Sequence, residues 1–378
     1  MKKVILIASL IILVLVTLTA CNNNNDSNGT AEQNQPTQNQ PAQDPPPQDP
    51  PPQDPPAATS GYRTGLGIYT SLGSSFNPGE GRGANPNGRV QADSTVVAIT
   101  VNSEGIITHA EVDAAQTFVE FDPYGVIVSD LNAPIFTKGE LRDDYNMRRV
   151  SDIGREWYEQ AAAFAEWMIG QTPAQVLGLS LSAGGVPEDA ALTSSVTVNV
   201  STYIEALRNA YANLRPIDAS GPFTMGIGIE SKIDASFNVG EGRGPNGRGQ
   251  IDSYVAVVTL DANGVIVAIT LDSIQARLEW ADDALLIGDI NAPNRTKLEQ
   301  GDDYNMRRAS DIEREWDEQA NALADWTIGR TLSQVLGMNV HDVDGRVNVP
   351  NEPELLASVT LPTGPFFSVI EKAVNNAR

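Results

Sequence analysis

The fold is decided by the stretch Val-Val-Ala-Ile-Thr-Val-Asn-Ser-Glu-Gly-Ile-Ile-Thr-His-Ala-Glu-Val, residues 96–112. Its two ends, 96–101 and 106–112, are rich in the β-branched residues Val, Ile and Thr, a composition typical of strands. Between them Asn102-Ser103-Glu104-Gly105 supplies turn-forming residues, so the two strands are expected to pair as a hairpin. Asp261-Ala262-Asn263-Gly264 is a second turn of the same kind.

This turn occurs twice because the chain contains an internal duplication. The block Asp-Asp-Tyr-Asn-Met-Arg-Arg at 143–149 recurs at 302–308, and the two copies agree at 29 of 42 positions between Thr137 and Gly178. Fixed self-similarity of this kind marks a repeated structural unit. We expect two domains, 61–215 and 216–378, joined at 215–222, and each is expected to fold alone.

The second half of each copy changes to helical spacing. Ile153, Trp157, Ala161, Phe164 and Met168 predict a helix that begins at an N-cap, Ser151, and ends at Gly170. In the second copy, Ser310 and Glu313 have the spacing of a capping box, and the helix is expected to end at Gly329.

Three further elements complete the first copy. We expect a short helix from Thr172 to Gly178, a strand from Ser195 to Val200, and a last helix from about Thr202 with Glu205 completing its cap. Strands first and helices later predict an α+β fold in which an antiparallel sheet is covered by helices.

The first 20 residues have the pattern of a secretory signal, a basic start followed by an apolar run. Such a run could also span a membrane, but Leu18-Thr19-Ala20-Cys21 resembles the lipobox of bacterial lipoproteins. In that family the Cys sulfur receives a diacylglyceryl group and the chain is cut before it. The resemblance implies that Cys21 is lipidated and acylated, for example with palmitate, and anchors the protein to the outer face of the cell membrane.

Residues 22–60 form an Asn-, Gln- and Pro-rich linker with almost nothing apolar to bury, so we expect this stretch to be disordered. In extended polyproline II at about 3.1 Å per residue the linker would reach on the order of 100 Å. A spacer of that length suits a surface protein that crosses a cell wall, which points to a Gram-positive cell.

Composition excludes several kinds of chemistry. The formal charge of −23 makes nucleic acid a poor partner. Cys21 is the only cysteine, so the lipidated chain has no thiol for a disulfide or a thiolate metal site. The only histidines, His109 and His341, have no counterpart in the other copy and are expected to be solvated surface or loop residues. We therefore expect neither a Ser-His-Asp triad nor a zinc site built from His and Cys. An enzyme is less expected than a binding protein.

A Gly-rich segment precedes the strands of each copy. Gly242 to Gly247 matches the G-x-G-x-x-G spacing, but it comes before a strand rather than after one, so a dinucleotide site is not expected. A plain connecting loop is one interpretation. The other is a phosphate site that uses arginines of this loop, Arg82 and Arg89 or Arg243 and Arg248.

The repeated block is the candidate ligand site. Lys, Arg and Asp side chains meet Tyr and Trp there, which would suit a planar anionic ligand. The alternative is a salt-bridged loop that docks the helix, with the tryptophans in the core. Asp143 and Asp144 could also bind Ca²⁺ or act as acid and base, although neighbouring carboxylates on a loop are usually solvated. The candidate residues are Lys138, Asp144, Tyr145, Arg148, Arg149 and Trp157, and in the second copy Lys297, Asp303, Tyr304, Arg307, Arg308 and Trp316.

The order of a Gly-rich start, a strand hairpin, a helical segment, a Ser/Thr-rich strand and a closing helix resembles the FMN-binding domain. That family occurs in tandem on surface lipoproteins of Gram-positive electron-export systems. It attaches FMN through a Thr in a Ser-Gly-Ala-Thr motif before its last helix. The nearest matches here are Thr197 and Thr360, which lack the Gly-Ala pair. The resemblance therefore implies FMN bound noncovalently, or a relative that has lost the cofactor.

Two classes of function are consistent with this sequence. The first is an extracytoplasmic ligand-binding or redox-carrier lipoprotein whose site is the repeated block. The second is a surface or adhesive protein whose duplicated domains act as interaction modules and bind no cofactor.

Overall fold

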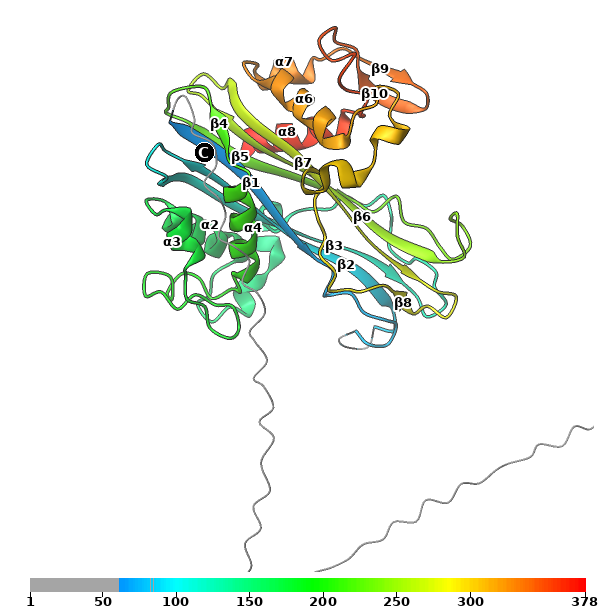
Figure 1. Ribbon diagram of the computed structural model, residues 1–378. Helices are drawn as coiled ribbons and strands as arrows, with labels where there is room; N and C mark the ends of the chain where they lie inside the picture. The colour runs from blue at the N-terminus through cyan, green and yellow to red at the C-terminus, as the bar shows by residue number, and fades with distance from the viewer. Residues whose placement is uncertain (1–60, 82, 84) are drawn as a thin grey trace, which may run out of the picture. The chain divides into compact units, whose positions relative to one another are not determined.

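The computed structural model describes residues 61–81, 83 and 85–378. The signal, Cys21 and the linker lie outside these residues. The described chain belongs to one compact unit. It contains two four-stranded antiparallel sheets, ordered β3-β2-β1-β4 and β5-β6-β7-β8, and a small sheet β10-β9. Helices cover both four-stranded sheets, so the predicted fold class is confirmed (Figure 1).

The strands are β1 (Tyr62–Ser71), β2 (Gly88–Val101), β3 (Ile107–Phe121), β4 (Arg215–Ile217), β5 (Thr224–Lys232), β6 (Gly247–Leu260), β7 (Ile266–Trp280), β8 (Leu286–Ile287), β9 (Val340–Val343) and β10 (Arg346–Pro350). The α-helices are α1 (Lys138–Leu141), α2 (Trp157–Met168), α3 (Pro173–Leu177), α4 (Ser201–Ala212), α5 (Lys297–Gln300), α6 (Trp316–Thr327), α7 (Leu332–Leu336) and α8 (Gly364–Asn376). Short 3₁₀ turns are η1 (Arg142–Tyr145), η2 (Met147–Arg149), η3 (Gly301–Tyr304) and η4 (Arg307–Ala309). Among the described helices, none combines the length and the apolar character that crossing a membrane requires.

The predicted hairpin turn joins β2 to β3. The Asn102 side chain accepts hydrogen bonds from the backbone N–H groups of Glu104 (3.0 Å) and Ile106 (2.9 Å). Gly105 adopts a φ of +76°, which glycine reaches without steric cost. Asp261 and Gly264 repeat this arrangement between β6 and β7, so both predicted turns are confirmed.

The two sheets pack face to face and share one core. Neighbouring residues of β2 point to opposite faces, so Val96 joins the core between the sheets while Val97 joins the core under the helices. At the end of the shared core the rings of Phe121 and Trp280 stack with centroids 4.2 Å apart. The Trp280 indole N–H donates to the Gly125 carbonyl (3.0 Å). Both repeats therefore depend on the same buried layer.

Reciprocal hydrogen bonds also join the repeats. The Asn77 side chain accepts from the backbone N–H of Leu286 (2.8 Å), and the Asn238 side chain accepts from that of Ile127 (2.8 Å). Each repeat thus gives the other the same contact.

Helices form the outer layers. Figure 1 shows α2, α3 and α4 against the first sheet and α6, α7 and α8 against the second. Glycines in β1 and β5 let the last helix of each repeat approach closely. A Cβ on Gly67 would lie 1.8 Å from the Ala206 carbonyl oxygen, and one on Gly228 would lie 2.0 Å from that of Val369. The result is four layers, helices, sheet, sheet and helices.

Four expectations about local structure were wrong. Residues 195–200 have an irregular backbone instead of a strand, with Val196 and Val200 buried. Helix α2 begins at Trp157, and Glu156 is its N-cap, whereas Ser151 accepts a hydrogen bond from Gln160 within the helix (3.2 Å).

The second copy differs from expectation in the same way, since α6 begins at Trp316 after an N-cap at Glu315. The last helix of the first repeat begins at Ser201, near the expected place, but Glu205 does not cap it and pairs with Arg208 (3.4 Å).

The junction between the repeats contributes to the first sheet. Strand β4 pairs antiparallel with β1, where Ile217 lies opposite Tyr62. The stretch expected to link two separate domains is thus a strand of one of them, and the expectation of independent folding conflicts with the shared core.

Candidate functional site

A capping box explains the repeated Thr-Lys-x-Glu at the start of the block. The Thr137 hydroxyl accepts from the backbone N–H of Glu140 (3.0 Å), and the Glu140 carboxylate accepts from that of Thr137 (2.8 Å). Thr296 and Glu299 repeat both bonds. The motif fixes the start of α1 and of α5, and so fixes the backbone of the lysine that follows each threonine.

Lys, Tyr and Trp of the predicted site come together in both repeats. The Lys138 ammonium lies 5.1 Å from the Tyr145 ring centroid and 5.6 Å from that of Trp157. The distances for Lys297 are 4.9 Å to Tyr304 and 5.3 Å to Trp316. Both tryptophans are buried, and a lysine held against aromatic faces gains cation–π attraction. We call each set the lysine–aromatic cluster.

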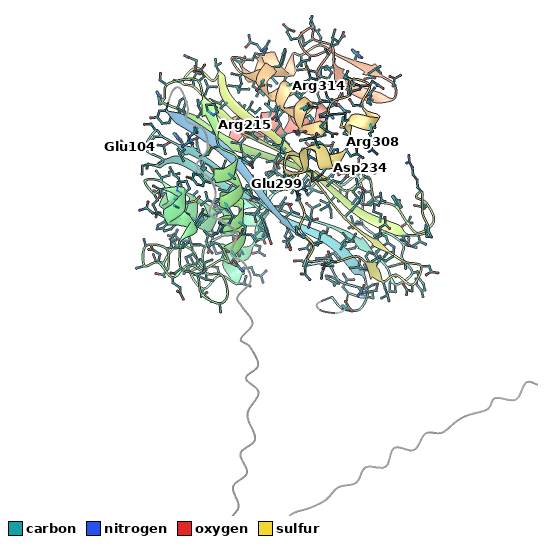
Figure 2. All side chains as sticks on the ribbon, viewed as in Figure 1. Glu104, Arg215, Asp234, Glu299, Arg308 and Arg314 are labelled. Carbon is teal, nitrogen blue, oxygen red and sulfur yellow. The ribbon has the colours of Figure 1, made fainter. Side chains whose placement is uncertain are left out.

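The arginines of the block lie on the surface. Arg148 pairs with Asp143 (3.4 Å) and Glu159 (3.0 Å), and Arg307 pairs with Asp302 and Glu318 in the same way. Four further predicted residues of the block are also exposed, namely Asp144, Arg149, Asp303 and Arg308. Of these, Asp303 pairs with Arg295 (2.9 Å). Figure 2 shows Arg308 on the helical side of the second repeat.

Glu156 is a buried carboxylate that the sequence analysis missed. It accepts hydrogen bonds from the backbone N–H groups of Met147 (2.8 Å) and Arg148 (3.1 Å). Glu315 does the same for Met306 and Arg307. These bonds dock the 3₁₀ turn onto the first turn of the following helix, so this part of the block serves the fold.

This arrangement predicts different effects for two neighbouring sets of substitutions. Arg148→Ala with Arg149→Ala should leave the unfolding midpoint nearly unchanged, because exposed ion pairs contribute little. Glu156→Ala should lower the free energy of unfolding by about 3 kcal/mol, because two backbone N–H groups lose their carboxylate acceptor. Urea denaturation of both variants measures the difference. Equal effects of the two changes would contradict the placement of Glu156.

A second missed carboxylate lies beside each lysine–aromatic cluster. Asp113 of β3 accepts hydrogen bonds from the backbone N–H groups of Ala114 (2.7 Å) and Gly139 (2.9 Å). Burial raises its pKa to about 6, against the opposing effect of bonds from Thr137 and these amides. Asp272 of β7 is its counterpart, 4% exposed, and burial raises its pKa to about 7. An Asp occurs at this position of the strand in both copies, although most of the neighbouring residues differ. This recurrence was the signal in the sequence that could have identified the carboxylate.

Each cluster gains another tyrosine from a different element. In the first repeat Tyr203 of α4 packs edge-on against Trp157, with centroids 6.3 Å apart. Burial raises the Tyr203 pKa, against the opposing effect of a contact with the Trp157 side chain. In the second repeat Phe366 takes that place, and Tyr254 of β6 packs edge-on against it at 5.6 Å. These tyrosines occupy non-equivalent positions, so comparing the repeats does not reveal them.

A cavity of about 640 Å³ opens beside the first cluster. It lies between β3, α1 and α2 of the first repeat and the end of α8. Two ion pairs join the repeats along it, Glu111 with Arg378 (2.8 Å) and Glu140 with Lys372 (2.8 Å). The cavity reaches the Asp113 carboxylate, so it connects this buried group with solvent.

The Gly-rich loops connect β1 to β2 and β5 to β6, as the plain interpretation expects. The Arg89 guanidinium pairs with Glu120 (2.6 Å) and lies 4.1 Å from the Phe118 ring centroid. Arg248 pairs with Glu279 (3.0 Å) and lies over Phe237. A carboxylate already neutralises each guanidinium, which disfavours phosphate binding there.

The two threonines that resemble flavin attachment points contact α2 and α6. The backbone N–H and hydroxyl of Thr197 both donate to the Gln160 side chain (2.8 and 3.3 Å). Thr360 makes the same pair of contacts with Gln319 (2.8 and 3.2 Å). Both glutamines are buried, so these bonds tie the chain before the last helix to the preceding helix. The contacts fit a structural role.

His109 is not a solvated loop residue. It lies on β3, half-buried, and its Nε2 atom lies 3.0 Å from the Phe223 carbonyl oxygen of the second repeat. Burial lowers its pKa, so the ring is neutral at pH 7 and takes part in the contact between the repeats. His341 lies on β9 of the small sheet, also half-buried.

Comparison with protein-family models and with curated proteins gave no match. Among solved structures, a neutral ceramidase from Pseudomonas aeruginosa aligns with 56% of this chain at 12% identity and a TM-score of 0.16. The alignment covers 31% of the ceramidase chain. A likeness this weak carries no argument about fold or activity, so the function has to be argued from the residues of this chain.

Proposed function

We propose that the protein is a lipid-anchored extracytoplasmic binding protein, and that a small polar molecule binds in the cavity beside Asp113. The observation that carries this proposal is a cavity lined by the half-buried Asp113, whose pKa is raised by burial. Burial of an ionisable group destabilises its charged form, and groups of this kind are concentrated at functional sites. The volume lies within the range of about 300–1,000 Å³ that ligand pockets occupy.

The surroundings of the carboxylate support binding. Trp157 of the first lysine–aromatic cluster lines the same cavity, so a bound molecule could contact its ring. No reaction is proposed, because the arrangement holds a ligand without a paired nucleophile and base.

Location at the membrane rests on the lipobox. Replacement of Cys21 with Ala should abolish lipidation, because no other residue of the chain carries a thiol. We expect the variant to appear in the medium or as an uncleaved precursor, and metabolic labelling with a tagged palmitate measures the change. Normal labelling of the variant would refute the anchor.

Binding is tested by thermal shift of the purified full-length protein against separate panels of amino acids, amines, sugars and flavins. We expect one class to raise the melting temperature, and Asp113→Asn to remove that effect. Absorbance near 450 nm reports any flavin that is carried through purification. If no class has an effect, the proposal fails and the interaction-module function replaces it. Exposed apolar side chains at equivalent positions of the two repeats, Val126 and Leu285, support that second candidate.

A further inference from the structure

The two repeats differ at the position that decides whether the cavity reaches the aspartate. Gly139 lies over Asp113, and a Cβ on it would lie 2.8 Å from the nearer carboxylate oxygen. The counterpart is Leu298, whose backbone N–H makes the equivalent bond to Asp272 (3.2 Å) and whose side chain packs on the helix-side core. Asp113 is half-buried and lines the cavity, whereas Asp272 is 4% exposed. Leu298 therefore closes access to Asp272 in the second repeat, whereas Gly139 leaves access to Asp113 open in the first.

Charges are distributed unevenly along the open cavity. Glu111 and Glu140 are neutralised by Arg378 and Lys372. Asp113 forms no ion pair within the described part of the chain and accepts only hydrogen bonds from neutral groups. Asp113 therefore gives the cavity a negative charge that a bound ammonium group would neutralise, while the ring of Trp157, which also lines the cavity, would add cation–π attraction.

Two guanidiniums line the same cavity, that of Arg142 at the start of η1 and that of Arg155 just before α2. Arg142 lies 4.5 Å from the Tyr158 ring centroid, and neither it nor Arg155 forms an ion pair with the residues that the structure describes. Gly301 and Asp317 replace Arg142 and Tyr158 in the second repeat, so this cation on an aromatic ring is specific to the first. An anionic group would bind these guanidiniums, even though Glu166 adds an exposed carboxylate to the cavity lining.

Apolar side chains also line the cavity, with Val112, Ala163 and Ile227 among them. We infer that the cavity of the first repeat binds a small zwitterion of the α-amino-acid type, its ammonium at Asp113, its carboxylate at Arg142 and Arg155, and its apolar side chain against these residues. The second repeat, with Leu298 over Asp272, does not bind it. This inference rests on the proposed function and names its ligand and its place.

The probes are L-leucine, N-acetyl-L-leucine and L-leucinamide, measured by isothermal titration on the full-length protein. We expect one L-leucine per chain. The acetyl derivative lacks the ammonium and the amide lacks the carboxylate, so each should bind at least about tenfold more weakly, as expected for loss of one charge-assisted contact. Equal affinity for the three compounds would overturn the zwitterion assignment.

Variants separate the two repeats. Asp113→Asn keeps the shape of the carboxylate and should weaken L-leucine binding at least about tenfold, and Gly139→Leu should abolish it. Asp272→Asn should leave it unchanged. A stoichiometry of two, or equal losses from the two Asn variants, would overturn the difference between repeats. Binding of a sugar or flavin that depends on Asp113, without binding of L-leucine, would refute this inference and retain the proposed function. Absence of binding by every class refutes both.

Discussion

Neither half of the chain is expected to fold alone when the protein is cut between residues 220 and 221. The inner faces of both sheets meet in one core, so separation would expose a complete apolar sheet face in each half. Loss of a single buried aromatic already costs about 3–5 kcal/mol, which is a large fraction of the stability of a typical domain. Thermal melts followed by circular dichroism should show no cooperative transition in either half, and mixing the halves should restore one.

Substitutions in the intact chain provide the control for this prediction. Trp280→Ala should lower the free energy of unfolding by about 3–5 kcal/mol because its ring stacks on Phe121 across the shared core. Tyr124→Ala, at a ring that is 84% exposed, should change it little. Two monomeric halves that each melt cooperatively at the temperature of the whole protein would contradict the shared core.

Asp272→Asn is expected to stabilise the protein at neutral and alkaline pH. The folded protein holds a proton on Asp272 up to about pH 7, whereas the unfolded chain releases it near pH 4. The folded state therefore binds more protons across this window, and this group's contribution to stability falls as pH rises from about 4 to about 7. A shift of this size corresponds to up to about 4 kcal/mol, which the uncharged amide would not lose.

Asparagine suits the position because one oxygen of Asp272 accepts both backbone N–H groups, those of Ser273 (2.7 Å) and Leu298 (3.2 Å). Urea denaturation of wild type and variant from pH 4 to pH 8 measures the difference in unfolding free energy. The difference should be near zero at pH 4 and grow to its full value by about pH 7. Asp113→Asn should behave alike over a smaller window that ends near pH 6. A difference that is constant with pH would show that Asp272 is ionised in the folded protein throughout.

Much of the fold could be predicted from local sequence. The β-branched residues of 96–101 and the turn chemistry of Asn102 and Gly105 are local features, and the hairpin that they predict is confirmed. Packing of one sheet on the other could not be predicted in this way. The strands are apolar on both faces, as in Val96 and Val97, and this pattern does not say whether the second face meets helices or another sheet.

The candidate site was predicted in part. The block placed Lys138, Tyr145 and Trp157 correctly together, because a capping box and a short turn hold them within one continuous segment. Asp113 lies on a strand far away in sequence, and Arg378 reaches the cavity from the other repeat, so only the three-dimensional packing brings them to it. The helix starts were misplaced because Glu156 is an unusual N-cap. Its carboxylate accepts hydrogen bonds from the preceding 3₁₀ turn, and this contact makes Glu156 the residue before the helix.

The reciprocal bonds of Asn77 and Asn238 have the pattern of an isologous interface, in which each subunit of a twofold dimer offers its partner the same patch. Here both patches belong to one polypeptide. In a homodimer every substitution appears on both sides of the interface at once, so a change at one ligand pocket is imposed on the other. Fusion removes that constraint, because the two copies mutate separately while the interface keeps them assembled. The difference between Gly139 and its counterpart Leu298 can arise in such a fused pair, whereas a symmetric homodimer carries the same residue in both subunits.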